Sequence, residues 1–481
     1  MVTDAHRSPT KRHSYAYDSA GPRRHWTSAR LAGDLTAEAI AALPTYDWQK
    51  EAFKTGRSQN YELSASGGND KTTFYWSGSY LTQDANLINI DFLRGSTNLN
   101  VIHKISPKVT FENSIKLSTQ KGRGQFGGPL GGSFLGASSF SSPLILPMVP
   151  IYKEDGSFST PLDGGIPGIL NQNIIMVSQL NKIQSVQNQA VGNVSLTWKI
   201  ADGLTLCPFA SIDYRTNKGD NYTDPRTPDA FNVNGRLGFQ YNQNVNFLTN
   251  AVLNYNKMFS ETRGECLVSY EYRSDVNEGY FGTIEGFLRP TLNMLKLGYE
   301  LHLNRWWLEW FQKAIGICQA KYDFKNKYFV SATARYDGSS RFGVNNRYGL
   351  FPALSAGWLI SEEPFLKNNT VLSELKLRAS YGTTGNDQIG FFPGLGLVGG
   401  GANYNNLSGT APTQMANPNL KWERNVTGEV GLEYGFFGGR ISGQINYFNR
   451  TSKDLLLNRP CLSPVDLALS WTMWASYATV A

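Results

Sequence analysis

The sequence predicts an all-β protein, an antiparallel up-and-down transmembrane β-barrel, and three observations support this. Apolar and polar residues alternate at every second position over segments of roughly 8 to 11 residues. Aromatic residues make up 13% of the chain and glycines number 48, but only 17% of residues are charged, which favours strands and turns over helices. Short turns and long loops alternate between the segments, as they do at the two rims of an outer-membrane barrel.

The strands are placed by the period-two pattern, because successive side chains of a strand point to opposite faces. The clearest segments are 109–117, 194–200, 328–337, 375–381, 426–434 and 440–447. Short turns are predicted at 67–71, 105–107, 201–203, 257–263, 325–326, 362–373 and 436–439. Long loops are predicted at about 82–93, 119–189, 214–244, 274–319, 338–349 and 383–421. This order gives fourteen strands, with the long loops on the external side.

The segment YFVSATARYD (328–337) indicates what each face meets. One face has small apolar residues between two tyrosines, and the other has hydroxyls, a guanidinium and a carboxylate. The span from Tyr328 to Tyr336 is roughly 26 Å at about 3.3 Å per residue, which, when tilted, matches an apolar band roughly 25 Å tall. Tyrosine rings suit the membrane interface. The residues predicted to face lipid are Tyr328, Val330, Ala332, Ala334, Tyr336, Tyr381, Tyr434 and Tyr447, and those predicted to face the lumen are Arg335, Lys376, Arg378, Glu429 and Glu433.

A soluble β-sandwich would show the same alternation and is the alternative fold. Sandwich strands bury their apolar face in a core, which favours densely packed Leu, Ile, Val and Phe. In this chain the apolar face often carries Gly and Ala in the middle of a strand, with Tyr or Trp near its ends. That distribution favours the barrel.

Charge and motif content argue against several other classes. The formal charge is +7, of which +4 comes from the first 30 residues, and no basic stripe with interleaved aromatics suggests nucleic-acid binding. The four cysteines are far apart and form no zinc spacing. We expect no metal, no cofactor and no catalytic residue, and therefore no enzyme. No run of about 18 apolar residues could form a membrane-spanning helix, and the first residues lack the apolar core of a signal peptide.

The long loops contain the candidate ligand contacts. Aromatic rings there could stack on sugars or hold a peptide, although loop aromatics also pack loops against each other. The candidates are Tyr222, Phe231, Phe391, Phe392 and Tyr404. In the turn-rich segment DGSSRFG (337–343), we expect Asp337 to accept backbone hydrogen bonds and Arg341 to reach a neighbouring segment.

Four blocks of the sequence resemble the SusC/RagA type of TonB-dependent outer-membrane transporter of Bacteroidetes-like bacteria. The blocks are 47–87, 334–365 (ARYDGSSRFG…), 377–390 (LRASYGTTGNDQIG) and 417–456 (NPNLKWERN…). The resemblance implies a barrel of about 22 strands with a plugged lumen. It also implies import of a large nutrient, an oligosaccharide or a peptide, with a SusD-like surface lipoprotein and the TonB–ExbB–ExbD complex as partners.

The resemblance divides the chain into three parts. Residues 1–44 are atypical for the family and are expected to be disordered, 45–458 form the barrel portion with an atypical insert at 296–319, and 459–481 are an atypical tail. No signal peptide, TonB box or plug has a counterpart in the sequence, so we expect an inactive outer-membrane fragment with about 14 strands of a larger barrel. The alternatives are a plugless passive porin and a soluble, secreted glycan-binding β-sandwich.

Overall fold

The computed structural model describes residues 44–124, 145, 147–160, 173–287, 298–405, 407–462, 467–473 and 477–480. The predicted N-terminal segment therefore lies outside the described residues, except for Pro44. Among the described helices, none is long and apolar enough to cross a membrane.

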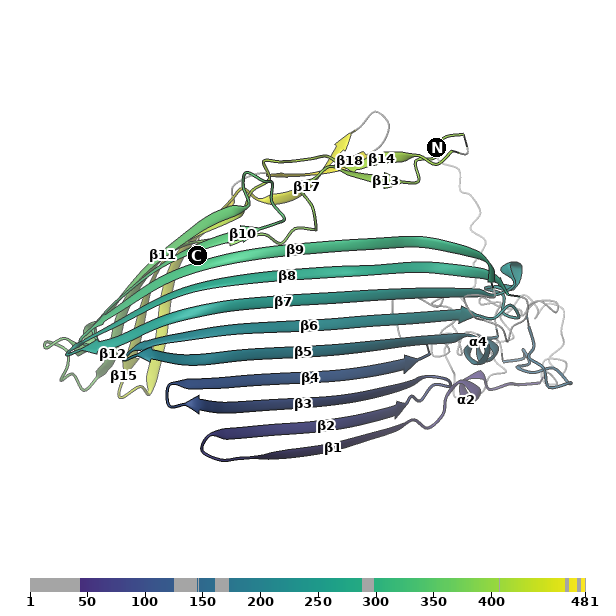
Figure 1. Ribbon diagram of the computed structural model, residues 1–481, viewed down its shortest axis with the longest axis horizontal. Coiled ribbons are helices and arrows are strands. Elements are labelled where there is room, and N and C mark those ends of the chain that lie inside the picture. Colours follow the sequence, from purple (N-terminus) through teal and green to yellow (C-terminus); the bar gives the residue numbers. More distant parts are fainter. Residues whose placement is uncertain are drawn as a thin grey trace, which may run out of the picture.

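Fourteen strands form one curved antiparallel sheet in which each strand pairs with its neighbours along the chain (Figure 1). They are β1 (Arg57–Gly68), β2 (Thr72–Asp84), β3 (Asp91–Ser106), β4 (Val109–Arg123), β5 (Lys182–Ala201), β6 (Leu204–Thr223), β7 (Arg236–Phe259), β8 (Thr262–Phe287), β9 (Gly298–Phe324), β10 (Tyr328–Ser339), β11 (Tyr348–Leu359), β12 (Leu372–Asn386), β15 (Glu423–Phe436) and β16 (Ile441–Lys453). A short strand, β19 (Tyr477–Val480), pairs with β16. The sheet runs from β1 to β19 without closing, which confirms the predicted fourteen-stranded, incomplete up-and-down barrel.

The short turns lie where they were predicted. Residues 69–71, 107–108, 202–203, 260–261, 325–327 and 437–440 each separate two paired strands. At the turn between β9 and β10, Lys325 and Asn326 both adopt the left-handed conformation, with φ of 57° and 54°. Two successive left-handed residues give the turn a twist that matches the flanking strands. The register of β9 against β10 is therefore fixed locally by this turn.

Two of the predicted long loops are wrong in extent. Most of 214–244 belongs to β6 and β7, and most of 274–319 belongs to β8 and β9, so the residues predicted as an atypical insert lie almost entirely within β9. Strands β5 to β9 have 20 to 27 residues, whereas a tilted transmembrane strand needs only about 9–11. These strands extend well beyond an apolar band. Where both faces of a strand lie in water, both faces carry polar residues. The alternation of apolar and polar residues that predicts a strand is then lost.

A compact set of loop elements packs at the long-loop end of β1 to β5. Helices α2 (Trp48–Ala52) and α4 (Ile174–Leu180) lie close together there (Figure 1). Trp48 is buried and donates a hydrogen bond from Nε1 to the Val149 carbonyl at 3.2 Å. The fully buried Asn173 caps α4, because its Oδ1 accepts from the backbone amides of Ile175 and Met176. This part of the long loop 124–181 is therefore anchored.

A second, four-stranded sheet has the order β13-β14-β18-β17. Strands β13 (Leu397–Gly400) and β14 (Thr410–Gln414) come from the connection between β12 and β15, and β17 (Leu456–Leu462) and β18 (Leu467–Met473) follow β16. Figure 1 shows this small sheet above the long strands, near β9 and β10. Part of the predicted atypical tail thus pairs with the long loop 387–422.

The strand register places all eight residues predicted to face lipid on one face of the large sheet. One row across the sheet joins Val330 to Ala356, Ala356 to Ala379, Ala379 to Val430 and Val430 to Tyr447. Val330 is 46% exposed and Tyr447 is 59% exposed, and no described element covers this row. A β-sandwich would bury these side chains beneath a second sheet, so the structure contradicts the sandwich alternative.

A buried carboxylate joins the short-turn ends of β10 and β11. Glu363 follows the 3-10 helix η7 (Ile360–Glu362) in the connection between β11 and β12. It accepts hydrogen bonds from the Tyr328 hydroxyl at 2.6 Å and from the Trp358 indole at 3.1 Å, and it lies 3.5 Å from the Lys327 ammonium. These bonds, the Tyr328 bond above all, lower the pKa of Glu363. The adjacent Glu362 instead pairs with Lys367 at 3.3 Å.

We expect Glu363→Gln to destabilise the sheet at neutral pH and to remove a pH-dependent part of its stability. A group whose folded pKa is depressed stabilises the fold above its unfolded pKa of about 4.3, and this stability is lost as pH falls through the folded pKa. The denaturant midpoint, followed by tryptophan fluorescence, should therefore fall more steeply with acid in the parent protein than in the variant. Glu362→Gln is the matched control. Equal acid slopes in parent and Glu363→Gln would contradict this role.

Candidate functional site

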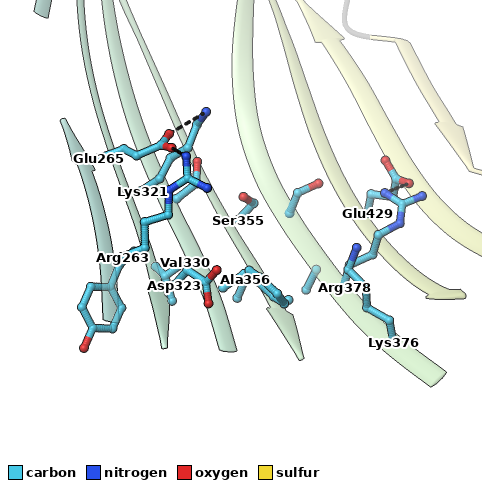
Figure 2. A pocket seen from close by; sticks show the side chains of 16 residues that line it. Arg263, Glu265, Lys321, Asp323, Val330, Ser355, Ala356, Lys376, Arg378 and Glu429 are labelled. Atoms are coloured by element: carbon cyan, nitrogen blue, oxygen red, sulfur yellow. Dashed lines mark ion pairs between the residues drawn. The ribbon is translucent and has the colours of Figure 1, made fainter. Parts of the chain in front are cut away.

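The concave face of the sheet carries a charged cavity of about 520 Å³. Side chains from β8, β9, β10, β11, β12 and β15 line it, and six neighbouring strands can share one cavity only where the sheet curves toward that face. In Figure 2, Arg263, Glu265 and Lys321 lie on one side of the cavity, and Arg378 and Glu429 lie on the other. The polar positions of the period-two pattern are therefore brought together inside the curve of the sheet.

Ion pairs fix the charged groups on both sides of this cavity. On one side, Glu265 lies 2.7 Å from Arg263 and 3.6 Å from Lys321. On the other, Arg378 pairs with Glu429 at 3.0 Å and with Glu433 at 3.1 Å. These side chains are between 28% and 52% exposed, so each pair contributes only about 0–1 kcal/mol to stability. The arrangement presents both signs of charge to whatever occupies the concave space.

A glycine leaves room for the Arg378 guanidinium. Gly431 faces Arg378 across the β12–β15 pair, and a Cβ there would lie 2.8 Å from Arg378 Nε and 2.6 Å from Asn446 Oδ1. Arg378 also donates a hydrogen bond to that amide oxygen at 2.8 Å. A residue larger than glycine would therefore displace the ion-pair network.

Four of the five residues predicted to face the lumen lie together at this site. Lys376 pairs with Glu433 at 3.3 Å, next to the Arg378 group. The fifth, Arg335, lies on the same face but farther along β10 toward the long loops. It donates from Nε to both carboxylate oxygens of the buried Asp337, at 2.8 and 2.7 Å. The expectation that Asp337 binds backbone amides is thus replaced by a side-chain ion pair.

The sequence alone did not identify the other half of the cavity. Arg263 was assigned to a predicted turn, although β8 begins at Thr262. Glu265, Lys321 and Asp323 continue the alternation on the same two strands, and register places Arg263 opposite Asp323 and Glu265 opposite Lys321. Alternation within 262–267 and 320–324 is the signal that could have found them.

A second cluster fastens the long loops to the rim. The buried side chains of Phe342, Phe351, Ile389, Leu420 and Trp422 form one hydrophobic core, drawn from the segments around 341, 351, 389 and 421. Three of the four sequence blocks contribute to it. Block 334–365 contributes Phe342 and Phe351, and blocks 377–390 and 417–456 contribute Ile389, Leu420 and Trp422 from the connection between β12 and β15. The motifs are therefore close in space and share a packing role.

Two cations lock this rim core, which is defined by the five residues above. Arg341 donates a hydrogen bond to the Asp387 carbonyl at 2.8 Å, as the sequence predicted for a neighbouring segment. Its guanidinium stacks 4.2 Å from the centroid of the Phe311 ring. The Lys313 ammonium lies 3.2 Å from the Asp387 carboxylate and 5.3 Å from the Trp422 ring centroid. Loop 387–422 is thereby fastened to β9.

The five candidate ligand aromatics do not form one site. Tyr222 is only 3% exposed and packs edge-on against Phe287, so its ring belongs to a hydrophobic core at the long-loop ends of β6 to β8 and not to an open surface. Phe391 lies 5.8 Å from Arg341, and Phe392 packs against Trp310 with ring centroids 5.6 Å apart. The two side chains left open at separate points of the rim are Phe231, 55% exposed, and Tyr404, 85% exposed.

Comparison with known proteins gives consistent matches. A family model described as TonB dependent receptor-like, beta-barrel, matches residues 185–477. TonB-dependent receptor P39 of Formosa agariphila is 30% identical over 426 residues, which cover 86% of this chain and 39% of that protein. TonB-dependent receptor SusC of Bacteroides thetaiotaomicron is 28% identical over 464 residues, which cover 89% of this chain and 44% of that protein. The chain spans less than half the length of the curated relatives it matches.

Among solved structures, the fold is similar to that of the RagAB peptide transporter. The TM-score is 0.74 at 21% sequence identity, and the match covers 96% of this chain and 52% of that chain. Similarity at this identity establishes the shared fold.

We expect Arg341→Lys to loosen loop 387–422 without unfolding the sheet. Lysine loses the guanidinium stack on Phe311 and the fixed bond to the Asp387 carbonyl, which together correspond to about five-fold more frequent local opening. Limited proteolysis, with cleavage sites mapped by mass spectrometry, should show faster cutting within 387–422. The control is Arg347→Lys, because the backbone carbonyl of Arg347, not its side chain, accepts the Trp422 hydrogen bond. Unchanged cutting in Arg341→Lys would exclude the locking role.

Proposed function

The chain belongs to the TonB-dependent receptor family and corresponds to part of the family's β-barrel. On this premise, we propose that it forms the wall of an outer-membrane importer for a large nutrient. The single observation that supports this is the two-sided sheet. One face is apolar, uncovered and rich in aromatic rings, and the other gathers charged side chains from four strands around a cavity that six strands line. A membrane barrel with a polar interior needs both faces.

Aromatic rings on the uncovered face fall into two bands. Near the short turns, Phe324, Tyr328 and Trp358 stack side by side, with centroids 6.3 and 6.4 Å apart. Farther along the strands, Tyr336 stacks on Tyr348 at 5.3 Å. Two bands separated by the length of a tilted transmembrane strand fit the two interfaces of a bilayer. Of the predicted lipid-facing tyrosines, Tyr328 and Tyr336 belong to these bands in this proposal.

The proposed cargo is an oligosaccharide or a peptide. The similarity to SusC and to the RagAB peptide transporter supports a large-nutrient importer, but the chain spans only part of those proteins. The open cavity with paired charges could hold polar cargo or a plug domain facing the same wall. A SusD-like lipoprotein at the long-loop rim and TonB–ExbB–ExbD as the energy source complete the proposal, which involves transport and no chemical conversion.

Alternating membrane exposure of β10 is the direct test of the proposed orientation. Nitroxide labels would be placed singly at Val330, Ser331, Ala332 and Thr333, in a background with the native cysteines changed to serine and the protein reconstituted in liposomes. We expect labels at Val330 and Ala332 to collide mainly with dissolved oxygen, which concentrates in lipid, and labels at Ser331 and Thr333 to collide with a water-soluble nickel chelate. Nickel-chelate access at all four positions would contradict a membrane barrel.

Uptake measurements separate active import from passive diffusion. Native cells with the gene deleted should stop depleting either a defined oligosaccharide mixture or a defined peptide mixture from the medium. Deletion of tonB should cause the same loss, because the proposed import requires energy from the inner membrane. Depletion that depends on the gene but continues without TonB would identify a passive porin instead.

A further inference from the structure

A groove across β3 to β6 lies on the face of the sheet opposite the charged cavity. Its volume is about 470 Å³. Gly95 and Ala190 provide the small residues of its floor, and Leu117 and Tyr214 border it. The Thr119 hydroxyl donates a hydrogen bond to the Asn188 side-chain oxygen at 2.8 Å at the end nearer the long loops. The groove is therefore apolar along one part and polar at one end.

The groove lies on the face proposed to meet lipid. Register joins Leu117 to Ala190 and Ala190 to Tyr214 across three strands, without a bulge in these stretches. The same register continues through Val245, Val276 and the neighbouring strands to the face that carries Val330. Leu117 is 46% exposed and Tyr214 is 38% exposed. The inference rests on the proposed membrane orientation.

Two lysines stand just beyond the polar end of the groove. Lys121 lies two residues after Thr119 on β4, and register places Lys121 and Lys218 on either side of Val186. Both side chains therefore share the face of the groove. Lys121 follows the start of β4 by 12 residues, or about 40 Å along the strand, which corresponds to roughly 30 Å of height at a tilt near 40°. That height lies just above an apolar band of roughly 25 Å, at the level of lipid headgroups.

The local charge favours an anion at this level. Within the described residues Lys121 makes no ion pair, and Lys218, with a side chain 65% exposed, pairs only with Asp220 at 3.5 Å. Arg123 on the same face is matched by Asp91 at 3.0 Å, so that pair adds no net charge. An exposed pair such as Lys218 with Asp220 is weak and can open to a stronger partner. The two ammonium groups are thus placed to meet phosphate above an apolar groove.

We propose that this groove binds a membrane lipid with a phosphate-bearing headgroup, with an acyl chain along Leu117, Ala190 and Tyr214 and the phosphate between Lys121 and Lys218. The Thr119–Asn188 pair provides polar contacts at the junction of chain and headgroup. Each lysine near a lipid surface corresponds to about a five-fold preference for anionic lipid. The site therefore selects one lipid class on one side of the barrel wall.

Spin-labelled lipids provide the test. The protein would be reconstituted in phosphatidylcholine vesicles that contain labelled phosphatidylglycerol or labelled phosphatidylcholine, and the motionally restricted fraction of each would be measured. We expect the parent protein to prefer phosphatidylglycerol and the double variant Lys121→Gln/Lys218→Gln to lose at least about five-fold of that preference. The control Lys116→Gln/Lys199→Gln removes two charges from the opposite face of β4 and β5 and should keep it.

A second variant tests the groove without changing charge. Ala190→Leu fills the floor from the outer face and should lower the restricted fraction of phosphatidylglycerol. Equal preference in parent and double variant would overturn the site, as would displacement of the restricted lipid by inorganic phosphate alone, which would indicate a free-phosphate site. If nitroxides at Val330 and Ala332 report lipid while this preference is absent, only the lipid site fails. If they report water, the membrane orientation itself fails.

Discussion

The antiparallel hydrogen-bond ladder from β1 to β16 is the interaction on which the rest of this molecule depends. In hydrocarbon each backbone amide and carbonyl needs a partner within the protein, and a ladder of paired strands supplies one. The same ladder fixes the register, and a slip of one residue would exchange the two faces of a strand. At β12 such a slip would turn Arg378 and Lys376 outward and Leu377 inward. Face assignment, the charged cavity and the outer groove all follow from one pairing pattern.

The two ends of the sheet are held by different means. At the short-turn end, the Glu363 carboxylate collects the polar tips of Tyr328 and Trp358, so aromatic side chains on adjacent strands share one acceptor. At the other end, packing dominates, because the rim core and the stacked Arg341 hold segments that are distant in sequence. The Glu363 hydrogen bonds place a charged group near the membrane boundary. The rim core instead buries apolar side chains at the end that faces water. Each suits the solvent at its own end.

Sequence patterns predicted the features that depend on local geometry. Alternation gave the faces of 328–337 and 426–434, and the hairpin turns followed from their short polar connections. Strand length was missed, because β7 and β8 continue into a region where polar residues suit both faces. The Lys313–Asp387 and Arg341–Asp387 contacts join residues 74 and 46 positions apart, and no local pattern identifies Asp387 as the partner. Burial of Tyr222 was missed for the same reason, since Phe287 covers it from another strand.

The unequal strand lengths make the long-loop rim of the sheet higher on one side than on the other. Strands β5 to β9 are the longest, while β1 to β4, β10 to β12, β15 and β16 have only 12 to 16 residues each. A large molecule near the long-loop rim would therefore meet a taller wall at β5 to β9 than at the shorter strands. The side from which a large molecule approaches this rim therefore determines how far it travels before it first contacts the wall.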